Sequence, residues 1–369
     1  MLKNQQFHPF EMAFCGLSGS GKSTLIQALL KKLTPHFKIG YIKHDAHKFE
    51  IDKPGKDTER AKASGANQVY INNSSNWASH GDKIEDRAFE RYNFLLNDFV
   101  IIEGYKKSAI PKFIFVNGES PLQADQFENV IAVIGEKENC SYPGYTYYQR
   151  DQVDLIAKAM LKYWRDLQAS VCLKGLILTG GRSSRMGSDK GALAYHGVNQ
   201  IDYLQSLLNP HCEEVLVSCR EDQAQHYFTE NHQQLHDRFL GLGPSGGILS
   251  ALQSDPNSAW LVIACDLPHL KETDLEQLIK NRDPFKMATT FENPEKGWPE
   301  PLCAIWEPHA YPRLLQYVGL GWPCPRKVLM NSNIKTIIPE NKIALENANT
   351  PEDFSNAVNK IDGSVNHAN

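Results

Sequence analysis

The fold of the second half of the chain is decided by one glycine-rich, basic stretch, Leu178-Thr179-Gly180-Gly181-Arg182-Ser183-Ser184-Arg185-Met186-Gly187-Ser188-Asp189-Lys190. It follows an apolar run at residues 174–178 that predicts a strand, so the glycines should lie at the carboxyl edge of a parallel sheet, where open α/β sheets bind ligands. Gly180 and Gly181 allow the backbone to approach a nucleotide triphosphate. Arg182 or Arg185 can neutralise phosphate charge, and Lys190 can reach a leaving pyrophosphate. The alternative is a basic loop that binds nothing.

Two later stretches supply acidic and glycine-rich partners for that loop. Asp266 follows an apolar run at residues 260–265, and a carboxylate there can hold Mg²⁺ against a triphosphate while one side stays solvated. Asp237 is a further candidate, and so is the turn at residues 241–247, which opens a helix expected from Gly246. We therefore predict a nucleotide-triphosphate site in which Asp266 binds the metal.

The last helix of the chain has a recognisable start. Thr350 is the expected N-cap, with Pro351 at the first helical position and Asp353 at the third. Asn347 and Asn349 could belong either to this helix start or to the site.

The first part of the chain contains a glycine loop of different spacing, Gly16-Leu17-Ser18-Gly19-Ser20-Gly21-Lys22-Ser23, which fits the P-loop pattern completely. It follows an apolar run and opens a helical one, which is the context that the motif requires. Backbone N–H groups around Gly16, Gly19 and Gly21 would surround phosphate oxygens. Lys22 would reach the β- and γ-phosphates, and the hydroxyl of Ser23 would ligate Mg²⁺. The alternative is a structural glycine turn.

A P-loop enzyme usually carries an acidic residue after a later strand, which organises Mg²⁺ or water. Glu103, after the apolar residues 99–102, is the candidate metal ligand here, although Asp is the commoner residue at such a position. The alternative is a solvated carboxylate at a strand end. We include Thr24, which follows Ser23, in the predicted nucleotide-binding set.

Short β-branched runs alternate with helical patterns along the whole chain, which predicts a parallel α/β architecture. The alternation restarts after a long helix expected at residues 152–167, so we predict one domain at residues 1–170 and a second at 171–369. Expected strands are at residues 12–16, 39–43, 68–71, 99–102, 113–116, 130–134, 174–178, 215–218 and 260–265, and expected helices at 22–33, 84–96, 152–167 and 273–279.

Composition excludes several classes of protein. The chain has 369 residues with 39 Lys and Arg against 43 Asp and Glu, a net charge of −4, so we expect neither a nucleic acid nor a membrane surface as partner. No apolar run reaches the roughly 20 residues that span a bilayer, and the N-terminus lacks a signal-peptide pattern. The 8 cysteines show no zinc spacing, so we expect a cytoplasmic protein with reduced thiols.

A resemblance adds to this interpretation of the first part. The P-loop, Lys43-His44-Asp45-Ala46-His47, Asp52-Lys53-Pro54-Gly55-Lys56-Asp57-Thr58 and the IIEGYKK segment that contains Glu103 occur in this order. Together they resemble the MobB family, the GTP-binding adaptor proteins of molybdenum cofactor biosynthesis, over most of residues 10–167. The resemblance implies a P-loop NTPase-like domain with weak GTP hydrolysis, and it carries over Gly21, Lys22, Ser23, Glu103 and Asp45 as site residues.

The second part closely resembles the MobA family, the molybdenum cofactor guanylyltransferases, over residues 172–360. The motifs that carry this resemblance are LTGGRSSRMGSDK, GPSGGILSAL, CDLP and NANTPED. It implies a Rossmann-like nucleotidyltransferase domain, similar to the nucleotide-diphospho-sugar transferases. The implied GTP–Mg²⁺ site comprises Leu178, Thr179, Gly180, Gly181, Lys190, Asp237 and Asp266. Ser218 stands where family members often carry Asn for the base, and the pair Gly180 and Gly181 favours guanine over cytosine by analogy.

The reaction implied is transfer of GMP from GTP to Mo-molybdopterin, giving Mo-molybdopterin guanine dinucleotide and pyrophosphate. We expect Lys190 and Arg185 on the phosphates and Asp266 on Mg²⁺. Residues 297–302 could line the pterin side, or could be a connector. A molybdoenzyme or a molybdenum-insertion protein is a possible partner. The alternatives are a sugar-1-phosphate nucleotidyltransferase fused to a P-loop domain, and a nucleotide-switch adaptor that uses the first domain alone.

Overall fold

A computed structural model describes residues 7–44, 51–82, 87–116, 127–135, 144–179, 190–221 and 232–366. The chain forms two compact units, Met1–Leu161 and Lys162–Asn369. Helix α4 (Val153–Ala169) runs across the limit between these units and ends next to residue 170. We therefore keep residues 1–170 and 171–369 as the proposed domains.

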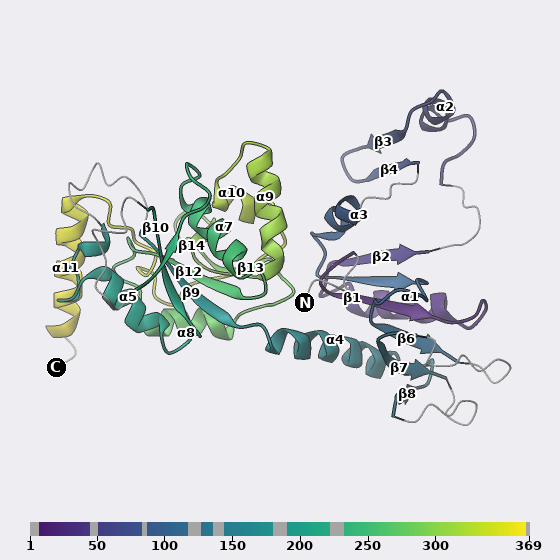
Figure 1. The fold of residues 1–369 in the computed structure, drawn as a ribbon, viewed down its shortest axis with the longest axis horizontal. Coiled ribbons are helices and arrows are strands. Elements are labelled where there is room, and N and C mark those ends of the chain that lie inside the picture. Colours follow the sequence, from purple (N-terminus) through teal and green to yellow (C-terminus); the bar gives the residue numbers. More distant parts are fainter. Residues whose placement is uncertain are drawn as a thin grey trace. The chain divides into compact units, whose positions relative to one another are not determined.

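The first unit is built on a parallel sheet with the strand order β2-β5-β1-β6-β7-β8 (Figure 1). Its central strands β1 and β5 are buried along their whole length, which explains their continuous apolar sequences. The elements of this sheet are β1 (Glu11–Cys15), α1 (Lys22–Leu33), β2 (Ile39–Lys43), α3 (Arg87–Phe94), β5 (Phe99–Glu103), β6 (Lys112–Phe115), β7 (Val130–Ile134) and β8 (Thr146–Tyr148). The predicted helix at residues 22–33 and the predicted strands at 39–43 and 130–134 are confirmed to the residue.

One predicted strand of the first unit lies outside the parallel sheet. The stretch at residues 68–71 belongs to β3 (Gln68–Asn72), which pairs antiparallel with β4 (Trp77–Gly81). Helix α2 (Asp57–Ala63) packs next to this hairpin. Strand β4 was not predicted, because Trp-Ala-Ser-His-Gly has no β-branched residue and no alternation of apolar and polar side chains.

The second unit has a mixed sheet with the strand order β11-β10-β9-β12-β14-β13-β15 (Figure 1). Strands β11, β10, β9 and β12 are parallel, whereas β14 is antiparallel to both of its neighbours. The strands are β9 (Leu173–Leu178), β10 (Val215–Cys219), β11 (Gln233–His236), β12 (Ala259–Ala264), β13 (Ala288–Glu292), β14 (Pro299–Trp306) and β15 (Lys335–Ile337). The predicted α/β class with two domains of parallel strands is thus confirmed, with the antiparallel β14 as an addition.

The helices of the second unit are α5 (Gln200–Leu208), α7 (Pro244–Ser254), α8 (Glu272–Lys280), α9 (Tyr311–Gly319), α10 (Pro325–Met330) and α11 (Pro351–Asn366). Helix α7 begins at Pro244, two residues before the expected Gly246, because proline is favoured in the first turn and Gly243, with φ 58°, ends the preceding turn. The predicted cap of α11 is confirmed. Asp353 N–H donates to Thr350 Oγ1 at 3.1 Å, and Thr350 N–H donates to Asp353 Oδ2 at 2.9 Å.

A buried ion pair fastens the end of β14 to the loop after α8. Arg282 donates from Nε to Glu307 Oε1 at 2.6 Å and from Nη2 to Oε2 at 2.9 Å. Glu307 is fully buried, with 0% of its surface exposed. A carboxylate at this depth depends on its two charge-assisted hydrogen bonds.

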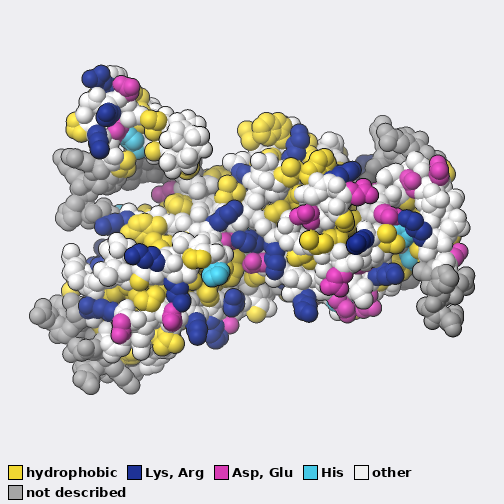
Figure 2. Space-filling view, turned by 180° about the vertical axis from the view of Figure 1, so that it is seen from behind, with side chains coloured by type: hydrophobic (Ala, Val, Ile, Leu, Met, Phe, Trp, Pro, Cys, Tyr) yellow, Lys and Arg dark blue, Asp and Glu magenta, His cyan; other side chains and the backbone are white. Residues whose placement is uncertain are grey.

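The surface of the molecule carries charges of both signs. Figure 2 shows basic and acidic side chains on both units, with apolar side chains between them. Among the described residues, no helix is both long and apolar enough to cross a membrane.

Candidate functional site

The carboxyl ends of four parallel strands meet at one edge of the second sheet. Leu178 at the end of β9 pairs with Ser218 of β10 on one side and with Ala264 of β12 on the other. Asp237 directly follows β11, and Asp266 follows β12 by two residues. The described residues of the predicted nucleotide site therefore come from neighbouring strands and lie along the same edge, where open α/β sheets bind ligands.

A chain of hydrogen bonds connects three of these residues. The buried Thr179 donates from Oγ1 to the carbonyl oxygen of Ser218 at 2.7 Å. The hydroxyl of Ser218 in turn donates to Asp237 Oδ1 at 2.6 Å. Burial raises the pKa of Asp237, while the hydrogen bond from Ser218 acts in the opposite direction. The hydroxyl of Ser218 thus holds the Asp237 carboxylate in place.

Helix α7 comes unusually close to this edge because it begins with small residues. A Cβ added to Gly246 would lie 2.3 Å from the carbonyl oxygen of Phe239, and one added to Gly247 would lie 2.5 Å from both Leu178 Cδ2 and Ser218 Oγ. A side chain at position 246 would have to displace the backbone of Phe239, and one at position 247 would have to displace the side chains of Leu178 and Ser218. The first turn of α7 is thereby placed beside Leu178 and Ser218.

Asp266 is joined to a segment far away in sequence. Asn347 donates from Nδ2 to Asp266 Oδ1 at 3.0 Å, and the N–H of Ala348 donates to the carbonyl oxygen of Asp266 at 3.0 Å. From the sequence, Asn347 could belong either to the helix start or to the site, and this contact places it beside the predicted metal ligand.

The glycine-rich stretch itself is described only at its ends. Gly180, Gly181 and Arg185 lie outside the described residues. Lys190 opens a short 3₁₀ helix (Lys190–Ala192), and only its backbone is described. Their predicted roles therefore stay predictions.

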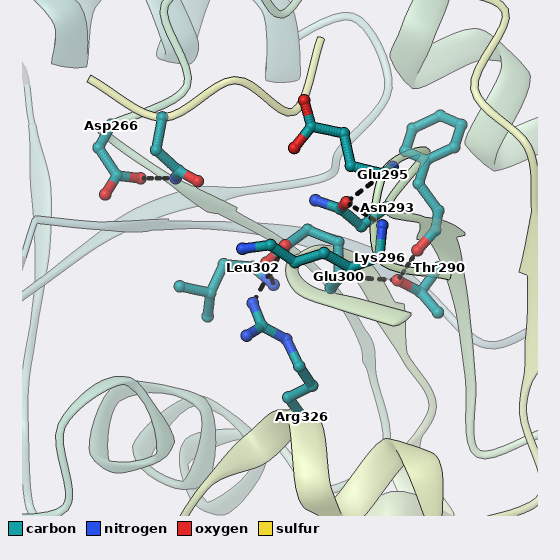
Figure 3. A network of polar contacts seen from close by, with 10 residues as sticks. Asp266, Thr290, Asn293, Glu295, Lys296, Glu300, Leu302 and Arg326 are labelled. Atoms are coloured by element: carbon teal, nitrogen blue, oxygen red, sulfur yellow. Dashed lines mark hydrogen bonds and ion pairs between the residues drawn. The ribbon is translucent and has the colours of Figure 1, made fainter. Parts of the chain in front are cut away.

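A second carboxylate lies near Asp266. In the strand order it is on the opposite side of β12 from Asp237. Glu300 belongs to β14, is 6% exposed, and contacts Arg326 of helix α10 (Figure 3). Burial raises the pKa of Glu300, Arg326 lowers it, and the charge of Asp266 adds to the rise. Glu300 belongs to the segment 297–302, which was predicted as a possible substrate lining from its aromatic and rigid residues, whereas Arg326 was not predicted.

The P-loop of the first unit connects β1 to α1. Gly19 and Gly21 have φ angles of 71° and 86°, which non-glycine residues rarely adopt. A Cβ on Gly16 would lie 2.7 Å from Phe115 Cβ, so the loop begins in close contact with β6. Lys22 donates from Nζ to the carbonyl oxygen of Leu17 at 2.7 Å, which folds its ammonium group over the loop.

Three side chains meet at the metal position predicted for this loop. Ser23 donates its hydroxyl hydrogen to the Glu103 carboxylate, with distances of 2.9 Å to Oε1 and 3.0 Å to Oε2. Tyr41, which the sequence analysis did not identify, donates from its hydroxyl to Glu103 Oε2 at 2.9 Å. Burial and this hydrogen bond raise the pKa of Tyr41 to about 12. Ser23 and Glu103, 80 residues apart, are thus brought together as predicted, while Thr24 is exposed in the first turn of α1.

Two basic side chains and one carboxylate lie around the P-loop. Burial lowers the pKa of Lys22, and the nearby Glu103 acts against this shift. The side chain of Arg150 also lies close by, since a Cβ on Gly21 would be 3.7 Å from Arg150 Cδ. Asp45, which the resemblance assigned to the site, lies outside the described residues. Within the part of the chain that is described, no group of three or more His, Cys, Asp or Glu side chains could hold a metal ion by itself.

Comparison with known proteins identifies two families in this chain. The family of molybdopterin guanine dinucleotide synthesis protein B, MobB, matches residues 12–136, and the MobA-like NTP transferase domain matches residues 175–332. These matches fall on the unit with the P-loop and on the unit with the glycine-rich stretch, respectively.

Three relatives show how far the likeness extends. A molybdenum cofactor biosynthesis bifunctional protein from Synechocystis is 41% identical over 49% of this chain and 52% of its own length. A probable molybdopterin-guanine dinucleotide biosynthesis adapter protein from Bacillus subtilis is 34% identical over 33% of this chain and 74% of its own. A probable molybdenum cofactor guanylyltransferase from Carboxydothermus hydrogenoformans is 32% identical over 48% of this chain and 91% of its own. The chain therefore belongs to the MobB family over its first part and to the molybdenum cofactor guanylyltransferase family over its second part.

Proposed function

We propose that the second part of this chain transfers GMP from GTP to Mo-molybdopterin, giving Mo-molybdopterin guanine dinucleotide and pyrophosphate. The observation that carries the proposal is the meeting of Leu178, Thr179, Asp237 and Asp266 at one sheet edge, in a chain of the guanylyltransferase family. We propose that the first part binds GTP at its P-loop and assists the same biosynthesis.

The reaction needs no protein nucleophile. An oxygen of the terminal phosphate of Mo-molybdopterin attacks the α-phosphorus of GTP in line, a new P–O bond forms, and the bond from the α-phosphorus to the bridging oxygen breaks to release pyrophosphate. The protein must hold two anions together and neutralise the charge that develops. We assign Lys190 and Arg185 to the phosphates and the N-terminus of α7 to the nucleotide.

The donor sets fit Mg²⁺, which prefers a few oxygen ligands and keeps waters or phosphate oxygens for the rest. Asp266 would hold the ion in the second part, and Ser23 with Glu103 would hold it in the first, where their oxygens already lie within 3.0 Å of each other. When bound, Mg²⁺ neutralises negative charge on the triphosphate. Asn347 keeps the Asp266 carboxylate oriented.

Lys190→Ala is expected to lower guanylyl transfer by roughly a hundredfold or more, because it removes a positive charge from the leaving pyrophosphate. The measurement is mass identification and quantification of the product from GTP and Mo-molybdopterin. Lys280→Ala, at the exposed end of α8, is the matched control and should keep the wild-type rate. A dinucleotide formed from a hexose 1-phosphate and not from Mo-molybdopterin would favour the sugar nucleotidyltransferase alternative.

Lys22→Ala is expected to weaken GTP binding at the P-loop by on the order of a hundredfold, because Lys22 is the cation of that loop. Guanylyl transfer at saturating Mo-molybdopterin should be unchanged, and transfer at low Mo-molybdopterin should slow if the first part delivers substrate, since fusion raises effective concentration. Lys31→Ala, at the far end of α1, is the control. Equal rates for Lys22→Ala and wild type at all Mo-molybdopterin concentrations would contradict a delivery role.

A molybdoenzyme or a molybdenum-insertion protein would accept the product. We propose a cytoplasmic location, where thiols stay reduced, and the described cysteines are all free thiols.

A further inference from the structure

Glu300 is a deeply buried carboxylate with weak partners. Its side chain belongs to β14, and the residue is 6% exposed. The N–H of Leu302 approaches Oε1 at 3.4 Å, and Arg326 Nη2 approaches Oε2 at 3.4 Å. Both distances exceed the usual 2.7–3.2 Å of an N–H···O bond. Among the described residues, Glu300 therefore keeps acceptor capacity for a further donor, which a buried carboxylate requires.

The backbone places Glu300 beside the proposed transfer centre. Strands β12 and β14 are antiparallel, and Ile263 pairs with Cys303. Beyond this pair, Asp266 lies in the turn that follows β12, and Glu300 lies three residues before Cys303 on β14, so the two carboxylates come from adjacent strands at the same end of the sheet. In Figure 3 the carboxyl group of Glu300 points towards Leu302 and the guanidinium of Arg326, and Asp266 belongs to the same view.

A partly exposed aromatic ring with two cations lies next to Glu300. Trp298, two residues earlier, is 43% exposed. The guanidinium carbon of Arg326 lies 5.7 Å from the centre of its ring, and Lys296 Nζ lies 6.0 Å from it. Arg326 also lines an open groove of about 450 Å³, together with Pro301 and Leu302 of β14 and Pro244 at the start of α7. Its volume is that of a site for a small molecule.

These features together suit a flat heterocycle with adjacent N–H donors and an anionic substituent. A carboxylate accepts two neighbouring N–H groups side by side, an indole ring offers a face for stacking, and Arg and Lys attract negative charge. A pterin carries such a donor pair on its 2-amino-4-oxo-pyrimidine edge. Guanine carries the same pair, so the position of Glu300 must decide between the two.

Position favours the pterin. The nucleotide residues Leu178, Ser218 and Asp237 lie on β9, β10 and after β11, on one side of β12 in the sheet order. Glu300 lies on β14, on the other side of β12. Because Asp266 follows β12, the two substrates would approach the transfer centre from opposite sides.

We propose that Glu300 binds the 2-amino-4-oxo edge of the pterin of Mo-molybdopterin, with Trp298 against the ring face and Arg326 and Lys296 near its anionic substituents. This inference rests on the proposed function of the second part.

Glu300→Gln tests the proposal with little change in volume. Its amide N–H₂ would face the donors of the pterin, so KM for Mo-molybdopterin should rise on the order of tenfold to a hundredfold, with KM for GTP unchanged. Trp298→Ala should weaken the same substrate by a smaller factor. Glu295→Gln, in the exposed turn between β13 and β14, is the matched control and should behave as wild type.

Two further measurements separate the possible outcomes. The preference for GTP over ITP, which lacks the 2-amino group, should be the same in Glu300→Gln and wild type, and loss of this preference would show that Glu300 binds guanine instead. Binding of metal-free molybdopterin is followed by its fluorescence and should weaken in Glu300→Gln. This measurement does not depend on the reaction, so it tests the proposal even if the wild type makes no dinucleotide. Unchanged molybdopterin binding in a folded Glu300→Gln variant would overturn the proposal.

Discussion

Asp266→Asn is expected to lower the rate of guanylyl transfer by about a hundred- to a thousandfold, with the fold retained. The substitution keeps the size of the side chain, but it removes the negative charge that would hold Mg²⁺ against the triphosphate. It also leaves Asn347 Nδ2 facing an amide instead of a carboxylate oxygen, so the orientation of the group at position 266 is weakened as well. The measurement is the initial rate of dinucleotide formation at saturating GTP and Mo-molybdopterin over a range of Mg²⁺ concentrations.

The control for this prediction is Asp166→Asn. Asp166 lies on α4, where it forms an exposed ion pair with Lys162, and loss of such a pair changes stability by no more than about 1 kcal/mol. Its rate and its Mg²⁺ dependence should equal those of wild type. If Asp266→Asn were fully active with an unchanged Mg²⁺ dependence, the metal-binding role of Asp266 would be wrong.

Arg282→Met is expected to destabilise the second unit by about 3–5 kcal/mol, because it leaves the carboxylate of Glu307 buried without its cation. Both hydrogen bonds of Glu307 to Arg282 are lost, at 2.6 and 2.9 Å, and water cannot replace them at a residue that is 0% exposed. Urea unfolding followed by the fluorescence of the buried Trp260 and Trp306 measures the loss.

The double variant Arg282→Met with Glu307→Leu is the matched control. Since it removes both charges and replaces them with apolar side chains, it should recover most of the lost stability. If the double variant were as unstable as Arg282→Met alone, the loss would come from packing around position 282 and not from the buried charge.

The sequence predicts those helices and strands whose limits are set by a local pattern of residues. Helix α1 and strand β2 were predicted to the residue, because a P-loop defines where its helix begins and an apolar β-branched run defines a buried strand. The Thr350 cap is equally local, since it needs only residues three apart. The roles of residues that depend on a single motif can therefore be predicted from the sequence.

Contacts between segments that lie far apart in the sequence could not be predicted in the same way. Tyr41 reaches Glu103 only because β2 and β5 are neighbours in the sheet, and nothing in the sequence near either residue indicates this order. Glu300 and Arg326 meet because α10 packs against β14, which is antiparallel in an otherwise mostly parallel sheet. The hairpin of β3 and β4 was not predicted for a similar reason. The residues of β4 have little intrinsic preference for a strand, and they form one through their pairing with β3.

The antiparallel register between β12 and β14 has a consequence for how this enzyme family can change its acceptor. Trp260 pairs with Trp306 and Ile263 with Cys303, so backbone hydrogen bonds fix the position of β14 relative to the end of β12, two residues before Asp266. A slip of one residue would turn every side chain of β14 to the opposite face of the sheet, so the spacing cannot be adjusted in small steps. A relative that accommodates a longer or shorter acceptor is expected to do so by altering the turn before β14 and helix α10. The register between β12 and β14 is expected to stay constant.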